Sequence, residues 1–273
     1  MRLQRKSTFS YIFRNFWRLV YVVLPVAVLL AFFYNPAREL SIFDALINGN
    51  ITADNFLGML TSVLTVLRLG KYWWVTLCAI LLLVLTMCLL VVMISRHMRV
   101  GKMQVFPIKK ALLIFPQMLL YVVVCIVANE LAMLVVVGLS YLIKFIGNVY
   151  AIVSITMVLA FAIRVFLTYL FGLLLMTFPL MYSDNYRFNV AMSHSARVMS
   201  SRQMNLFGMS LLYASLRLVV LIVAYMLAPF KLHVLVYGVA LTLCLMFIPS
   251  FAFKKFYDDI GGERRDLVQK LFD

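Results

Sequence analysis

The chain has 273 residues and a formal net charge of +15, with 65% apolar and only 13% charged residues. Soluble domains carry roughly 45–50% apolar and about 25% charged residues, so this composition excludes an ordinary soluble protein. Of the 25 Lys and Arg residues, 23 lie in short polar segments between long apolar runs. That distribution is typical of an oriented membrane protein, and no basic stripe of the kind that binds nucleic acid is present.

Six apolar runs reach the length of about 17–25 residues that a helix needs to cross a bilayer. The predicted spans cover about residues 17–34, 72–94, 111–142, 149–182, 206–227 and 234–253. The first is interpreted as a retained span, because no small-residue cleavage pattern follows it as in a signal peptide. The sequence therefore predicts an all-α, polytopic membrane helix bundle that forms one membrane domain over residues 1–273.

The third and fourth predicted spans are longer than a bilayer requires. Such spans tilt, bend or project beyond the hydrocarbon layer. Each contains a proline, Pro116 in the third and Pro179 in the fourth, and proline disrupts the hydrogen bonding of a helix. We expect any bend to lie near these two residues.

The distribution of cations predicts the orientation. With six spans, eighteen Lys and Arg residues fall in the two termini and the second and fourth connections, and five fall on the opposite side. Cytoplasmic loops carry the excess of positive charge, so both termini are predicted to be cytoplasmic. Arg18 is expected to extend its charged end to the same interface, and Trp73 and Trp74 to lie at the opposite one.

Two connections are long enough to form structure of their own. Apolar residues of the first, about residues 41–68, repeat at helical spacing and predict an amphipathic helix on the membrane or against the bundle. It is interpreted either as a membrane-resting connector or as a lid or docking surface.

The second connection, about residues 185–204, predicts an amphipathic helix with separate apolar and basic faces. Its candidate lipid-binding or partner-binding residues are Arg187, His194, Arg197 and Arg202. Cations beside an apolar face at the inner surface suit anionic lipid headgroups. A plain connector and a contact with a cytoplasmic partner remain alternatives.

Three charged residues lie inside spans, namely Glu130, Arg164 and Arg217. A charge facing lipid at the middle of a span costs roughly 2.5–3.5 kcal/mol on insertion scales, so each needs a polar environment. A structural Glu–Arg pair, a site for a substrate or lipid phosphate, and proton or ion coupling are the alternatives. Because Glu130 is expected nearer the outer face than Arg164, a pair requires the third span to be shifted or kinked at Pro116.

No signal for catalysis is apparent. The sequence contains no HExxH, Gly-x-Ser-x-Gly or P-loop motif, and the histidines His97, His194 and His233 are expected in three separate connections. The four cysteines lie in apolar runs without a CxxC pair, and the acidic tail is interleaved with cations. We therefore predict no catalytic residue, no cofactor and no metal site.

Two stretches resemble a group of known proteins. They are residues 191–199, which lead into Asn205, and the tail segment that contains Phe256-Tyr257-Asp258. They are similar to the fourth-to-fifth connection and the post-span Tyr-Tyr-Asp motif of bacterial six-helix membrane proteins of uncharacterised function. That group includes the membrane domain of some glycerophosphodiester phosphodiesterases. The resemblance implies a non-catalytic module of the bacterial inner membrane and transfers no active site.

Three functional hypotheses follow, and a lipid-modifying enzyme ranks last among them. The first is a non-enzymatic accessory or scaffold protein of the bacterial cytoplasmic membrane, whose partners are the lipid bilayer, anionic headgroups, another membrane protein or a second copy of itself. The alternative is a small permease or the membrane subunit of a transporter that uses Glu130, Arg164 and Arg217.

Overall fold

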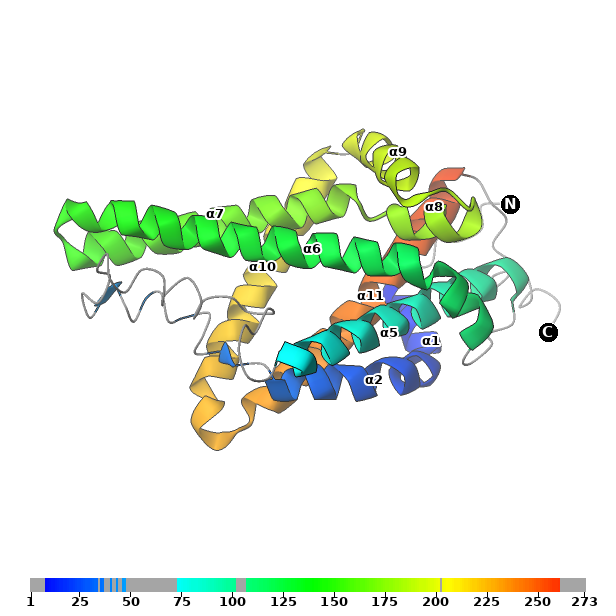
Figure 1. Cartoon of the computed structure of the whole chain (residues 1–273), viewed down its shortest axis with the longest axis horizontal. Coiled ribbons are helices and arrows are strands. Elements are labelled where there is room, and N and C mark those ends of the chain that lie inside the picture. The colour runs from blue at the N-terminus through cyan, green and yellow to red at the C-terminus, as the bar shows by residue number, and fades with distance from the viewer. Residues whose placement is uncertain are drawn as a thin grey trace.

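The computed structural model is a helical membrane protein (Figure 1). It describes residues 8–33, 35, 36, 40, 43, 46, 47, 73–101, 107–201 and 203–260. Every regular element among the described residues is a helix, and six segments are long and apolar enough to cross a membrane. The prediction of an all-α fold with six candidate spans is confirmed.

The spanning segments are α2 (Phe16–Phe33), α5 (Trp73–Val100), α6 (Ile108–Ile143), α7 (Val149–Leu173) with α8 (Thr177–Ser183), α10 (Gln203–Met226) and α11 (His233–Ile260). The shorter elements are α1 (Thr8–Arg14), η1 (Lys144–Ile146), α9 (Phe188–Ser200) and η2 (Ala228–Phe230). The predicted spans agree with these bounds, except that α5 and α11 continue for more than a turn past the predicted ends.

The spanning helices pack in chain order, and the last packs against the first. Each spanning helix contacts the next one along the chain, α11 returns to pack against α2, and α5 also contacts α11. Helices α2, α6 and α10 start, and α5, α8 and α11 finish, at one end of the bundle, beside α1 and α9 (Figure 1). We call it the basic end, because its described residues include Arg14, Arg99, Lys110, Arg197 and Lys254.

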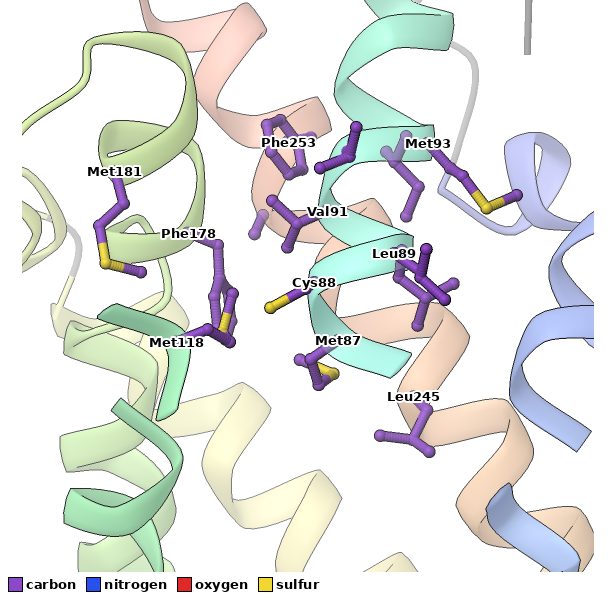
Figure 2. Close-up of a cluster of buried hydrophobic side chains, with 14 of the residues drawn as sticks. Met87, Cys88, Leu89, Val91, Met93, Met118, Phe178, Met181, Leu245 and Phe253 are labelled. Atoms are coloured by element: carbon purple, nitrogen blue, oxygen red, sulfur yellow. The ribbon is translucent and has the colours of Figure 1, made fainter. Parts of the chain in front are cut away.

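The core is centred on α5, which buries 61% of its most apolar 18 residues. Every residue from Met87 to Ser95 is buried. Figure 2 shows side chains of α5, α6, α8 and α11 in one cluster, among them Cys88, Met118, Phe178 and Phe253. A helix that is apolar on all sides is suited to such a central position.

The fourth span is broken between α7 and α8 by a turn at residues 174–176. Pro179 lies in the first turn of α8. In a continuous helix it would have no N–H to donate to the carbonyl of Leu175, and its ring would crowd that carbonyl. The predicted bend near Pro179 is therefore present. At Pro116, by contrast, α6 remains one helix of 36 residues.

The break also leaves the Leu173 carbonyl without its helical donor. The Thr177 N–H, which would reach Leu173 in a continuous helix, bonds instead to the Leu174 carbonyl at 3.0 Å. The Ser195 hydroxyl of α9 donates to the Leu173 carbonyl at 2.7 Å and is itself fully buried. Helix α9 is thus fixed to the end of α7 by a side chain that completes the backbone hydrogen bonding.

Helices α6 and α7 form a long antiparallel hairpin. Its turn consists of η1, Gly147 in a left-handed conformation (φ 80°) and Asn148, whose side chain accepts hydrogen bonds from the N–H groups of Tyr150 and Ala151. At about 1.5 Å per residue, α6 is roughly 54 Å long. That length exceeds the roughly 30 Å hydrocarbon layer, as the sequence predicted for this span.

The predicted amphipathic connector at residues 41–68 lies largely outside the described residues. Of its described positions, Leu46 is buried and Phe43 half-buried in a small cluster with Met133, Val136 and Ile152 of the hairpin. This part of the connection therefore packs against the α6–α7 hairpin, which is one of the two arrangements that the sequence allowed.

The prediction that His97 lies in a connection is wrong. His97 is in the last turn of α5, is 7% exposed, and its Nδ1 lies 3.1 Å from the hydroxyl of Tyr11 in α1. Helix α1 was not predicted. It packs on α11, with the rings of Phe9 and Phe247 5.2 Å apart.

Candidate functional site

The intramembrane charges Glu130 and Arg164 lie on facing sides of the α6–α7 hairpin. They are equally distant in sequence from Gly147 at its turn, and in an antiparallel hairpin such residues lie at the same level. No shift of the third span is needed, because both helices extend equally far toward the turn. The fold therefore brings these two predicted residues into the same region.

Asn129 connects the two charges. The Arg164 guanidinium donates from Nη1 to Asn129 Oδ1 at 2.6 Å and from Nη2 to the Met133 sulfur at 3.4 Å. The Asn129 amide in turn donates to Glu130 Oε1 at 3.4 Å. Glu130 is only 3% exposed, whereas Asn129 and Arg164 are half-buried. The amide accepts from the cation and donates to the carboxylate, so it suits both neighbours.

This arrangement offsets the cost of placing charges inside a span. Burying an isolated ion costs several kcal/mol, and that cost falls when an opposite charge and hydrogen-bonding groups are close. Here the carboxylate and the guanidinium share one amide, and the Arg164 backbone carbonyl also accepts from Thr168 Oγ1 at 2.8 Å. The hydrogen bonds among Asn129, Glu130 and Arg164 thus hold α6 and α7 together.

The third predicted residue, Arg217, has a different environment. It lies on α10, about two thirds of the way along the helix, and its charge acts on Tyr213 of the same helix and on Cys244 of α11. Arg217 thus lies at the α10–α11 contact, and Arg164 at the α6–α7 contact.

The predicted basic face of the second connection belongs to α9. The helix begins at Phe188, since Asn185 has a left-handed backbone (φ 56°), and Arg187 precedes it with extended backbone. His194 and Arg197 are exposed, and the His194 ring stacks on Tyr186 with centroids 5.4 Å apart. Arg202 lies outside the described residues.

The opposite face of α9 is buried against the protein. Its buried side chains are spaced at helical intervals: Phe188, Ala191, Ser195 and Met199. The apolar face of this amphipathic helix therefore covers the ends of α7 and α8, and its basic face is directed outward.

Two features were missed from the sequence. Asn129 was not singled out, although a polar Asn-Glu pair inside an apolar run was a visible signal. The hydroxyls of Ser95, Thr177, Ser250 and Tyr257 are buried without a hydrogen-bond partner in the described structure. They belong to α5, α8 and α11, which pack against one another toward the basic end. Isolated hydroxyls in apolar runs give no sequence signal.

No group of three or more His, Cys, Asp or Glu side chains that would hold a metal ion gathers in the described ranges. Searches of protein-family models, curated proteins and solved structures found no match to this chain. The six long apolar helices mark it as an integral, multi-pass membrane protein.

Proposed function

We propose that the chain is a non-enzymatic accessory or scaffold protein of the bacterial cytoplasmic membrane, with both termini in the cytoplasm. In this proposal the α6–α7 hairpin is a lateral contact surface for another membrane protein or for a second copy of the chain. The excess of cations at the basic end supports the orientation. The resemblance of residues 191–199 and of Phe256-Tyr257-Asp258 to bacterial six-helix membrane proteins supports the bacterial, non-catalytic assignment.

The observation that carries the proposal is the low burial of the hairpin. The most apolar stretch of the Val149–Ser183 span is 11% buried, against 61% in α5, and Val158 and Phe166 are 69% and 62% exposed. The same hairpin contains the half-buried Asn129 and Arg164. Partly exposed polar groups are costly toward lipid, and a packed neighbouring helix lowers that cost.

The alternative function is a small permease or transporter subunit in which Glu130, Arg164 and Arg217 line a path. The buried carboxylate favours this alternative, because ionisable groups in spans are commonly functional. Against it, the Arg164 guanidinium is engaged by Asn129 and Met133 in helix packing.

Native mass spectrometry of the gently extracted protein tests the proposal. A scaffold is expected to carry a second copy or a partner subunit, and a photo-crosslinking residue at Val158 or Phe166 should capture that same component. The matched control is Phe32 on α2, which is also well exposed (72%) and lies outside the hairpin. A monomer that carries only lipid would refute the scaffold role.

The double variant Glu130→Leu/Arg164→Leu separates the two functions. It removes both charges together and leaves no unpaired ion. A scaffold should keep its partner in this variant, because the apolar hairpin surface is preserved. Loss of the cellular function with an intact assembly would instead favour the permease.

A further inference from the structure

A groove of about 490 Å³ lies at the basic end, between the end of α9, the first half of α10 and the last turns of α11. It is separate from the α6–α7 hairpin surface. Its apolar walls include Met204, Met209 and Leu212 of α10 and Phe251 of α11. Met204 and Leu212 are 84% and 63% exposed, so the groove opens to the outside of the bundle.

The polar residues of the groove lie at one of its ends. Asn205 is in the first turn of α10, and Lys255 lies one turn beyond Phe251 toward the end of α11. Because the two helices are antiparallel, both residues are at the basic end. Leu212 is about 10 Å farther along α10, at roughly 1.5 Å per residue. The groove is therefore polar at the membrane surface and apolar toward the interior.

The charge of the groove favours an anion. Lys255 is its charged lining residue, and none of the described residues that line it is acidic. Lys254 adjoins Lys255 in the sequence, and Asp258 lies one turn beyond Lys255. Cations near the inner membrane surface attract anionic lipid headgroups.

The lining of the groove includes a glycine. A Cβ atom built on Gly208, which lines the groove, would meet no atom within 4 Å. The methionines of the lining are flexible thioethers that adapt to irregular apolar ligands. An extended alkyl chain fits such a surface better than a rigid side chain would.

We propose that this groove binds one membrane phospholipid, with its phosphate at Lys255 and Asn205 and an acyl chain along Met209, Leu212 and Phe251. The inference does not rest on the scaffold role, because it uses α9, α10 and α11 and none of the hairpin residues.

Gly208→Leu is the central test, because Gly208 lines the groove and a Cβ atom there would meet no protein atom within 4 Å. Its matched control is Gly138→Leu on α6, where a Cβ also meets nothing within 4 Å and no groove residue is nearby in sequence. The probe is dioleoyl phosphatidylglycerol, titrated into the delipidated full-length protein and counted by native mass spectrometry. We expect the tightest lipid adduct to weaken at least tenfold in Gly208→Leu and to be unchanged in Gly138→Leu.

Lys255→Gln tests the contact with the lipid headgroup, and it is the independent test if Gly208→Leu does not fold. Removing one cation near the surface should weaken phosphatidylglycerol binding by about fivefold. Inorganic phosphate alone should give no adduct with the wild-type chain, since it lacks an acyl chain. The proposal is overturned if Gly208→Leu binds lipid as the wild type does, if Lys255→Gln has no effect, or if inorganic phosphate binds as well as the lipid.

Discussion

Arg164 Nη1 of α7 donates a hydrogen bond of 2.6 Å to Asn129 Oδ1 of α6, midway along two spanning helices. The same amide donates to Glu130, so a neutral side chain mediates between a cation and a carboxylate. Hydrogen bonds between membrane helices contribute about 0.6 kcal/mol on average and up to about 1.7 kcal/mol. Asn129 makes contacts in both directions and therefore contributes more than a single bond.

Replacing Asn129 by Leu should destabilise the protein by about 1–3 kcal/mol, because the guanidinium and the carboxylate each lose a hydrogen-bonding group. The measurement is the thermal unfolding of the purified protein in detergent. Asn189→Leu, at an exposed position of α9, is the control and should unfold as the wild type does. Equal stability of Asn129→Leu and the wild type would show that the amide does not hold the hairpin.

Ser195→Ala should cost about 1–3 kcal/mol, since it leaves the Leu173 carbonyl without the buried hydroxyl that bonds it at 2.7 Å. Ser193 lies on the same helix but is exposed, so Ser193→Ala makes the same chemical change without this contact. Thermal unfolding of the two variants measures the difference. If Ser195→Ala and Ser193→Ala unfold alike, the hydroxyl does not stabilise the break between α7 and α8.

The sequence predicted the spans well because a bilayer sets both the length and the composition of a spanning helix. It predicted the bend at Pro179 for a local reason, because proline has no N–H to donate to the helix. Pro116 does not interrupt α6, which continues as one helix of 36 residues, since neighbouring packing decides whether a proline breaks a membrane helix. The expected difference in depth between Glu130 and Arg164 is wrong, because both residues lie equally far from the turn at Gly147.

Contacts between distant segments had no sequence signal. Helix α1 is polar and aromatic and too short to show clear periodicity, and its position depends on contacts with α11 and on the contact of Tyr11 with His97 of α5. The bond between Tyr11 and His97 joins residues 86 positions apart. The groove beside Lys255 likewise depends on how α9, α10 and α11 pack together, and no local sequence pattern predicts that packing.

Replacement by Phe should affect the stability of the protein differently at the two buried tyrosines Tyr11 and Tyr257. Tyr11→Phe removes a hydrogen bond to a buried His97 and should cost about 0.5–1.5 kcal/mol. Tyr257→Phe removes a buried hydroxyl that has no partner in the described structure, so it should be neutral or stabilising.

Chemical denaturation of the two variants in detergent gives the comparison, and Tyr150→Phe is the control because Tyr150 is 87% exposed. A loss of stability in Tyr257→Phe as large as that in Tyr11→Phe would mean that the Tyr257 hydroxyl is bonded in the membrane-extracted protein. Such a result would indicate that a bound polar group lies among α5, α8 and α11.

The contact between α7 and α10 depends on the small size of Gly172. A Cβ atom there would lie 3.3 Å from Leu206 Cδ2, at the end of a flexible side chain. Gly172→Ala therefore requires Leu206 to move by only a few tenths of an ångström. A helical Ala is favoured over Gly by up to about 1 kcal/mol, so this variant should be as stable as the wild type or more so.

Gly172→Leu should instead force the two helices apart and cost about 1–3 kcal/mol, as overpacked cores do. Close approach at small residues is a common way for membrane helices to associate, and this contact joins the α6–α7 hairpin to α10. Gly138→Leu, which meets open space, is the control for adding bulk to a spanning helix. Thermal unfolding that ranks Gly172→Leu below Gly172→Ala and Gly138→Leu supports the close contact, and equal stability of all three contradicts it.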